Sequence, residues 1–135
     1  KVAIFMKYLA TIEKITLVLN KYKPLLIITG ATPLKKRELY LKHFETKKNN
    51  KIILLTSRTG GFGINLIQAT RIVILSPDYN PAVDNQAAER SSRVGQTKKV
   101  VVYRIITEKT IEERIYNRQL DKMCATNLPI KSCWV

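Results

Sequence analysis

The sequence predicts an α/β fold in which a parallel β-sheet carries helices on both faces. Short apolar runs of strand length alternate with longer stretches whose apolar residues recur at helical spacing, and this alternation is typical of such sheets. The chain has 135 residues, 45% of them hydrophobic, which suits one compact domain. We expect a three-layer α/β/α domain over residues 1–122, followed by a tail of unknown structure at 123–135.

The strands are expected where short runs rich in β-branched and aliphatic residues lie between turn-forming residues. Most of these runs are apolar throughout, which indicates strands buried on both faces, as in a parallel sheet. The predicted strands are Val2–Phe5, Leu25–Thr29, Ile52–Leu55, Arg71–Leu75 and Val100–Ile106.

The first two helices are predicted from apolar spacing and from start signals. Residues 10–22 have apolar residues three and four apart, on one helical face. The second helix is predicted to begin with Thr32 as the capping residue and Pro33 at the first helical position, and to run to about Phe44. The apolar residues on the buried sides are Ile12, Ile15 and Leu19 in the first helix and Leu34, Leu41 and Phe44 in the second.

Two further helices are predicted from their caps. Asn80-Pro81 is again a capping residue followed by a proline, and the third helix is expected to run from there to about Val94. Thr110 and Glu113 have the spacing of a capping box, in which each side chain accepts a hydrogen bond from the other residue's backbone N–H. The last helix is therefore expected to start there and to end near Met123.

The formal net charge of +14 favours an anionic partner, and nucleic acid is the usual one. A basic solvated surface, neutralised by an acidic domain elsewhere in a longer protein, is the alternative. The longest apolar runs, such as Leu25–Ile28, are far shorter than the roughly 18 residues of a membrane helix, so no membrane partner is expected. Because the chain does not begin with Met, we expect it to be part of a longer protein.

Cysteine and histidine are too sparse for metal or triad chemistry. Cys124 and Cys133 lack a second pair, so they indicate reduced thiols rather than a metal site or a disulfide framework. His43 is the only histidine and lies on a predicted helix with basic neighbours. A multi-histidine metal centre and a histidine-dependent triad are therefore not expected, and no metal ligands are assigned.

A loop with three glycines follows the third predicted strand. Ser57–Asn65 contains Gly60, Gly61 and Gly63, which let the backbone turn sharply and approach a ligand closely. The spacing is neither that of a dinucleotide fingerprint nor that of a P-loop, because no glycine in the chain precedes Lys-Ser or Lys-Thr. Phosphate contact and a tight turn required only for packing remain equally good interpretations.

The third predicted helix carries a candidate phosphate clamp. Gln86, Arg90 and Arg93 lie at i, i+4 and i+7, so they share one face of that helix. Two guanidinium groups one turn apart suit a phosphate group, because each donates hydrogen bonds in a fixed planar fork. A solvated basic face paired with Glu89 explains the same pattern.

Asp78–Pro81 has a simple structural interpretation as a turn and helix cap. Its aromatic residue, Tyr79, is also of the type that lies against a nucleic-acid base or backbone.

Together these segments resemble the second-lobe motifs of the SWI/SNF family of helicase-like ATPases, in superfamily two. The match runs in the family's order from Val2 to about Lys122, and that order is more specific than any single motif. The matching segments are Ala3–Phe5 and Thr29–Pro33 with Arg37 for motif IV and the segment after it, Leu55–Leu66 for motif V, Ser76–Pro81 for the aspartate-tryptophan-asparagine-proline segment, Gln86–Gln96 for motif VI, and Val100–Glu113 for the last strand and the start of the brace helix.

The resemblance implies a RecA-like lobe that completes an ATP site shared with another lobe. Arg90 and Arg93 would face ATP and Mg²⁺ held mainly by a first RecA-like lobe of the same chain, and would stabilise charge on the γ-phosphate. Gln86 would help to organise this face, and Gly61 and Gly63 would shape the loop on the ATP side. This lobe alone is not expected to bind a cofactor.

The resemblance also implies a partner, duplex DNA. Thr29, Gly30, Ser57 and Arg58 would lie toward the DNA backbone, and Tyr79 would take the tryptophan position that couples ATP turnover to DNA movement. Phosphate contacts would make binding non-sequence-specific and salt-sensitive. Chromatin remodelling, transcription regulation, nucleosome binding and a nuclear location are further implications. The location becomes the host nucleus if the chain is viral, for example a baculoviral global-transactivator-like protein.

Several positions depart from the family pattern. Tyr79 replaces the usual tryptophan, Thr59 stands where alanine is common, Ser76 where aspartate is common and Ser92 where histidine is common. None of these departures removes an arginine. Gln96 stands where a DEAD-box RNA helicase tends to carry arginine, which favours the SWI/SNF branch.

Three other functions are compatible with parts of the sequence. They are a non-catalytic nucleic-acid-binding module, the lobe of an RNA helicase, and a degenerate lobe kept for protein interaction. The first explains the charge but not the ordered motifs. Because the sequence holds no P-loop, we expect this chain alone to bind DNA weakly and not to hydrolyse ATP at a useful rate.

Overall fold

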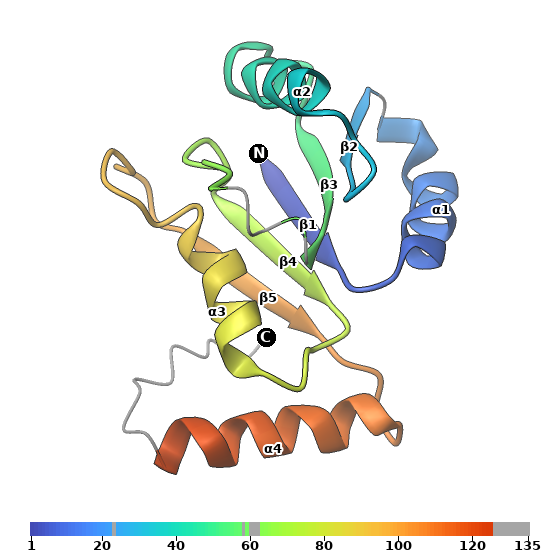
Figure 1. Ribbon diagram of the computed structural model, residues 1–135, viewed down its shortest axis with the longest axis vertical. Helices are drawn as coiled ribbons and strands as arrows, with labels where there is room; N and C mark the ends of the chain where they lie inside the picture. Colours follow the sequence, from blue (N-terminus) through green and yellow to red (C-terminus); the bar gives the residue numbers. More distant parts are fainter. Residues whose placement is uncertain (23, 58, 60–62, 126–135) are drawn as a thin grey trace.

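The computed structural model describes residues 1–22, 24–57, 59 and 63–125. They form a five-stranded sheet in which every pair of neighbouring strands is parallel (Figure 1). The predicted strands are confirmed, with ends that shift by no more than one residue. The strands are β1 (Val2–Met6), β2 (Leu25–Ile28), β3 (Ile52–Thr56), β4 (Arg71–Leu75) and β5 (Val101–Ile105).

The strand order across the sheet is β2-β3-β1-β4-β5. Strand β1 is central, and its first residue, Val2, pairs with Ile52 on one side and Arg71 on the other. Because all strands are parallel, their carboxyl ends lie together at one edge of the sheet and their amino ends at the opposite edge. We call these the carboxyl edge and the amino edge.

Helices cover both faces of the sheet, as predicted. Helices α2 and α3 pack on one face, α1 with a following 3₁₀ turn packs on the other, and α4 crosses below the carboxyl ends of the strands, beside α3 (Figure 1). No helix in the described ranges is both long and apolar enough to cross a membrane. The bounds are α1 (Leu9–Val18), the 3₁₀ turn η1 (Leu19–Tyr22), α2 (Leu34–Thr46), α3 (Pro81–Glu89) and α4 (Ile111–Ala125).

Alternate strand residues enter two separate cores, because successive side chains of a strand point to opposite faces. Ala3 and Phe5 of β1 face α2 and α3, whereas Ile4 and Met6 face α1. The connection from β3 to β4 passes over the first of these faces, and its last part, residues 63–70, is named the return segment. It contributes three buried apolar residues to that core: Ile64, Leu66 and Ala69.

Several predicted helix details are wrong. Thr32 does not cap α2: its hydroxyl accepts a hydrogen bond from the Thr29 N–H at 2.9 Å, so Pro33 becomes the N-cap residue. Leu34 is then placed in the first turn and is 64% exposed rather than buried. The first predicted helix ends as an α-helix at Val18 and continues only as the 3₁₀ turn η1.

The core account predicts a large loss of stability for Ile53→Ala. Ile53 is fully buried on β3, so truncation removes apolar contacts and leaves a cavity. We expect the free energy of unfolding in urea to fall by about 2–5 kcal/mol. Leu17→Ala on the exposed side of α1 is the control, and its loss should stay near 0.5 kcal/mol or below. Equal losses in the two variants would contradict this packing.

Candidate functional site

Helix α3 starts as predicted and ends early. The Asn80 side chain accepts a hydrogen bond from the Ala82 N–H at 3.1 Å, with Pro81 at the first helical position. The helix ends at Glu89 rather than near Val94, because the carbonyl of Arg90 accepts from the Leu66 N–H of the return segment at 3.1 Å. That carbonyl is therefore not used to extend the helix.

Because α3 ends at Glu89, the two arginines do not both lie on the helix as predicted. Arg90 is the C-cap residue of α3, and Arg93 lies in the turn after it, so the prediction that both share one helical face is wrong. Both guanidinium groups nevertheless reach the same stretch of backbone. Arg90 Nη1 lies 3.4 Å from the Ile64 carbonyl, and Arg93 Nη1 lies 3.5 Å from the Gly63 carbonyl.

Arg90 is a buried cation, whereas Arg93 is exposed. Only 4% of Arg90 is exposed, and its Nε has no hydrogen-bond partner among the described residues. Burial, and then the nearby charge of Arg93, lower the pKa of Arg90. Neither arginine has a carboxylate within 4.0 Å in the described part of the chain. A buried guanidinium without a counter-ion is costly, and an anion placed here would reduce that cost.

The glycine loop meets the arginines at its described end. Gly63 has a φ of +61°, a conformation that side chains other than glycine rarely adopt. Gly61 and Arg58 lie outside the described residues. Gln86 is on α3 with an exposed side chain. Gln96 joins the turn after α3 to the return segment, because its Nε2 donates to the carbonyls of Ile67 at 2.6 Å and Ser91 at 3.1 Å.

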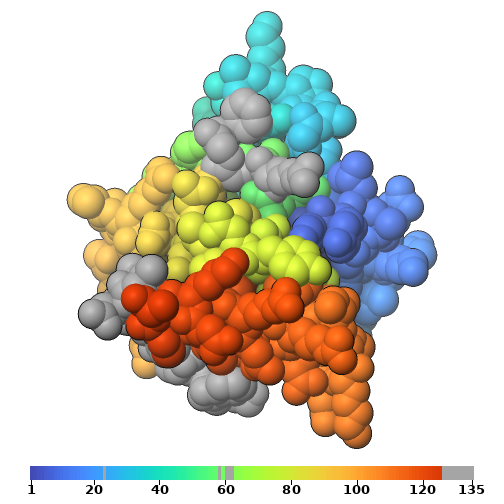
Figure 2. Space-filling view, turned by 60° about the horizontal axis from the view of Figure 1, so that its bottom comes forward, coloured from blue at the N-terminus to red at the C-terminus, as the bar shows by residue number. Residues whose placement is uncertain are grey.

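The residues predicted to face DNA follow three different strands and meet at the carboxyl edge. Thr29 and Gly30 follow β2, Ser57 follows β3 and Tyr79 follows β4. Figure 2 shows this side of the molecule, with α4 crossing in front of the segments that follow the strands. The described residues on the predicted DNA side therefore follow the carboxyl ends of strands, whereas Arg90 and Arg93 lie at and after the far end of α3.

The turn that carries Tyr79 is held from several elements. Lys7, after β1, lies with its Nζ 3.5 Å from Asp78 Oδ2 and 5.2 Å from the centre of the Tyr79 ring. From α4, Gln119 Nε2 donates to the Asp78 carbonyl, and Lys122 Nζ donates to the Tyr79 carbonyl at 3.3 Å. Tyr79 itself stays 52% exposed, so its ring is held in place and open to a partner.

A buried polar contact that the sequence did not reveal joins α4 to this turn. Gln119, 1% exposed, donates from Nε2 to Asp84 Oδ2 at 2.8 Å, and Asp84 also accepts from the Asp78 N–H at 3.3 Å. Burial raises the pKa of Asp84, and these hydrogen bonds oppose the rise. Gln119 lies four residues after Ile115 and four before Met123, both buried, so it shares their face of α4. This spacing is the sequence feature that could have predicted its burial.

Arg37 is a second residue whose role only the structure shows. Its Nε donates to the Thr32 carbonyl at 2.6 Å and its Nη2 to the Gly30 carbonyl at 2.8 Å, which fixes the turn after β2. Arg37 is buried, so the turn that carries Thr29 and Gly30 is held by the first turn of α2. The family-like segment after motif IV is thus tied together by its own arginine.

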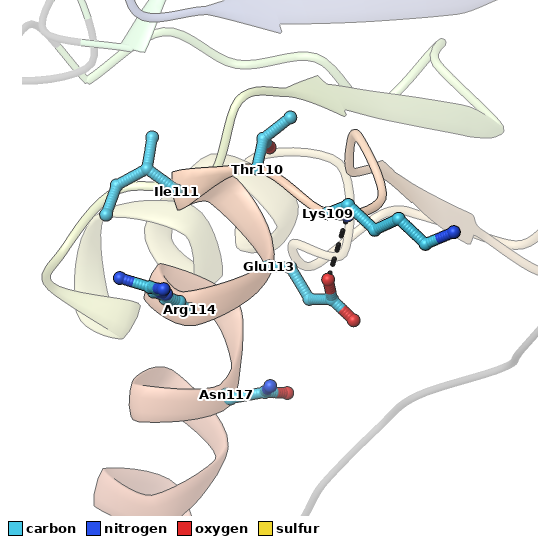
Figure 3. Close-up of a pocket in the computed structure, with 6 residues that line it drawn as sticks. All are labelled: Lys109, Thr110, Ile111, Glu113, Arg114 and Asn117. Carbon is cyan, nitrogen blue, oxygen red and sulfur yellow. Dashed lines mark hydrogen bonds between the residues drawn. The ribbon is translucent and has the colours of Figure 1, made fainter.

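The described residues contain a hollow of about 440 Å³ that is separate from both groups. It lies at the start of α4 and is lined by none of the predicted site residues (Figure 3). Its carboxylate, that of Glu113, already accepts a hydrogen bond from the Lys109 N–H at 2.9 Å. No cluster of three or more His, Cys, Asp or Glu side chains that could hold a metal is found in the described part of the chain.

A comparison with models of protein families shows which family the chain belongs to. Residues 1–95 match the helicase conserved C-terminal domain. The chain belongs to this helicase C-terminal domain family. The match covers the whole path from β1 through the return segment to the two arginines.

Individual relatives match about three quarters of this chain, and one of them is named as an SNF2 domain-containing protein. The chain is 47% identical over 102 residues to the DNA excision repair protein CSB of Oryza sativa subsp. japonica, covering 76% of this chain and 9% of that protein. It is 45% identical over 102 residues to the human DNA excision repair protein ERCC-6, covering 76% of this chain and 7% of that protein. The chain thus spans less than a tenth of either relative.

A solved structure supports the same fold. The C-terminal part of the Fun30 ATPase domain superposes with a TM-score of 0.84 at 37% identity, covering 88% of this chain and 39% of that chain. The helicase C-terminal domain described here is therefore a RecA-like lobe, as the sequence predicted. One departure from the family pattern is also explained, because the Thr59 hydroxyl is buried and donates to the Thr56 carbonyl at 2.8 Å.

The buried Asp84 predicts a pH-dependent loss of stability. Folding raises the pKa of Asp84 above its value in the unfolded chain. The protonated side chain therefore stabilises the fold at low pH, and this stabilisation is lost as the pH rises through the pKa of the folded chain. Asp84→Asn keeps an acceptor for Gln119 and removes the charge. We expect the variant to become more stable relative to the unaltered chain as the pH rises above about 4. The full difference in unfolding free energy should be about 1.4 kcal/mol for each unit by which folding raises the pKa of Asp84.

Urea unfolding at a series of pH values from about 4 to 8 measures this difference. Asp121→Asn on the exposed side of α4 is the matched control, and its difference from the unaltered chain should stay flat. A flat difference for Asp84→Asn as well would show that Asp84 titrates alike in the folded and unfolded chains.

Proposed function

We propose that this chain is the second lobe of an ATP-driven translocase that moves along duplex DNA. The observation that carries the proposal is the convergence of Arg90 and Arg93 on the glycine-bearing end of the return segment. Relatives named as DNA excision repair proteins, and one from Arabidopsis thaliana named Protein CHROMATIN REMODELING 8 at 45% identity, support a DNA substrate.

In this proposal the arginines complete an ATP site whose other half is the first RecA-like lobe of the same chain. The buried Arg90, with its unpartnered Nε, fits the negative charge of a triphosphate. Arg93 is exposed and so is free to reach across a closing cleft to the γ-phosphate. Mg²⁺ bound by the first lobe would neutralise phosphate charge. Gly61 and Gly63 would shape the loop, and Gln86 would organise the face.

The carboxyl edge is proposed to hold the DNA backbone. Thr29, Gly30, Ser57 and Arg58 would contact phosphates without reading the base sequence, as hydroxyl groups, backbone N–H groups and guanidinium groups do in general. Tyr79 would lie against the duplex and couple its movement to ATP turnover. Its ring is exposed and its turn is held by α4, which is what a coupling residue needs.

The partners and location follow as proposals. They are the first lobe of the same chain, duplex DNA, nucleosomes as one form of that DNA, and the nucleus, or the host nucleus if the chain is viral. This chain alone would bind DNA weakly and would not turn over ATP, because the P-loop and metal-binding motif belong to the first lobe.

We predict that Arg93→Ala in the two-lobed protein lowers DNA-stimulated ATP turnover by about 10³-fold or more, because an arginine finger contributes about that much. DNA affinity should change little, since Arg93 lies away from the carboxyl edge. Steady-state phosphate release with and without duplex DNA measures the first, and fluorescence anisotropy of a labelled duplex measures the second.

Arg118→Ala, an exposed arginine on α4, is the matched control and should leave turnover unchanged. A normal rate in Arg93→Ala would remove the finger assignment. Intact turnover after Arg90 and Arg93 are both replaced would favour a non-catalytic module. Stimulation by duplex RNA in place of DNA would favour an RNA helicase lobe.

A further inference from the structure

Exposed cations gather at the amino edge of the sheet, at the opposite ends of the strands from the residues proposed to face DNA. They lie in the turn after α2, directly before β3, at the start of β4 and directly before β5. All are exposed, and none has a carboxylate within 4.0 Å among the described residues. We name them the amino-edge cations: Lys47, Lys48, Lys51, Arg71, Lys98 and Lys99.

Backbone hydrogen bonds hold the segments that carry these cations side by side. The Val2 N–H donates to the Lys51 carbonyl at 2.8 Å, and the Arg71 N–H donates to the Lys1 carbonyl at 3.3 Å. The Val101 N–H donates to the Thr70 carbonyl at 3.0 Å. The cations therefore border the amino ends of β3, β4 and β5, with the start of β1 between those of β3 and β4.

Lys1 lies at the same edge but has a structural role. Its Nζ donates to the carbonyls of Phe44, Glu45 and Lys47 at the end of α2, where the unpaired carbonyls of a helix favour a cation. Lys1 is thus occupied within the fold. The amino-edge cations have no comparable task, so packing does not explain their presence.

Acidic residues are concentrated at the opposite end of the molecule. They follow β4 and β5 or lie on α4, close to the edge where the proposed function places DNA: Asp78, Glu108, Glu112, Glu113 and Asp121. The net charge of +14 is therefore unevenly distributed. The carboxyl edge carries mixed charge, whereas the amino edge is mainly basic; the acidic residues on that side are Glu45, beside Lys1, and Glu89, at the end of α3.

We propose that the amino-edge cations bind the phosphate backbone of duplex DNA, at a second surface separate from the carboxyl edge. A straight duplex lying along one edge of the sheet does not reach the other edge. The amino edge would therefore hold a different segment of DNA, and one copy of this chain would bridge two segments.

The chemistry of the surface favours DNA over a protein partner. The amino-edge cations are nearly all lysines, which act as flexible point charges toward phosphate and are depleted in protein interfaces. Among the described residues of the segments that carry these cations, no aromatic side chain is exposed to serve as the anchor that protein interfaces usually need, although Val94 in the connection from α3 to β5 is exposed.

The dimensions of the surface also suit a DNA backbone. From β3 across β1 and β4 to β5 the strands are about 4.8 Å apart, so the edge is about 14 Å wide. One DNA strand presents a phosphate about every 3.4 Å along the helix axis. A stretch of duplex as long as this edge therefore contains about four phosphates of each strand.

The test compares two charge-reversal triples in this chain. Lys51→Glu, Lys98→Glu and Lys99→Glu change the amino edge, and Lys14→Glu, Arg114→Glu and Arg118→Glu are the control on the outer sides of α1 and α4. Both triples lower the net charge equally. All six positions are exposed, so both variants should fold, which circular dichroism and urea unfolding check. A neutral triple, Lys51→Gln, Lys98→Gln and Lys99→Gln, removes the positive charges without adding carboxylates. It therefore separates the loss of lysine contacts from repulsion between new glutamates and DNA phosphates.

Two readouts are decisive. The first is the slope of log affinity against log salt concentration for a labelled duplex. Its magnitude should fall by about 2–3 for the amino-edge triple, because each lost phosphate contact removes about 0.9. For the control triple it should fall by less than about 1. In the second, a bead-bound duplex should capture a second labelled duplex through the unaltered chain and the control, but not through the amino-edge triple.

Equal changes in both triples would overturn the proposal, and so would bridging that survives the amino-edge triple. Capture of poly-glutamate with the same dependence on the amino edge, without any effect on duplex binding, would instead make this a protein-docking surface. None of these readouts involves ATP. Failure of the proposed arginine function would therefore leave this test unaffected.

Discussion

The burial of the Arg90 guanidinium beneath the return segment is the constraint on which the candidate site depends. The chain crosses from β3 to β4 over the face of the sheet, with Ile64 and Leu66 in the core and the Leu66 N–H bonded to the Arg90 carbonyl. This contact ends α3, turns the chain toward Arg93 and leaves a cation in a mostly apolar setting. The site folds within this core, but the buried Arg90 guanidinium has no counter-ion until an anion binds.

Helix α3 connects the two groups of proposed functional residues. It begins at the turn that carries Tyr79 and ends at Arg90, and nine residues at 1.5 Å each make a rigid link of about 14 Å. Gln119 and Asp84 fix its first turn to α4, and the return segment fixes its last. A shift of the Tyr79 turn against DNA would therefore move the arginines as well, which gives the proposed coupling a physical path.

The sequence predicted the strands and the order of the motifs because these depend on local apolar runs and cap residues. It failed where a distant segment decides the local outcome. The end of α3 depends on Leu66, so helical spacing alone extended that helix too far. The hydroxyl of Thr32 bonds to the Thr29 N–H, so the predicted capping residue of α2 was wrong by one position. Gln119 was missed, and Arg37 was singled out without a role, because a polar residue buried on a helix cannot be distinguished from a solvated one until its partners are known. The roles of all the predicted site residues stay predictions, and Arg58 and Gly61 also lie outside the described residues.

The central claim is that Arg90 and Arg93 face the γ-phosphate of a nucleotide held by the first lobe. A structure of the two-lobed protein with ADP and aluminium fluoride, a mimic of the transferring phosphate, tests it most directly. The account predicts guanidinium nitrogens of both arginines within about 2.7–3.2 Å of the fluoride group. If both side chains remained on the return segment, with the fluoride contacted by other residues, the account would be contradicted.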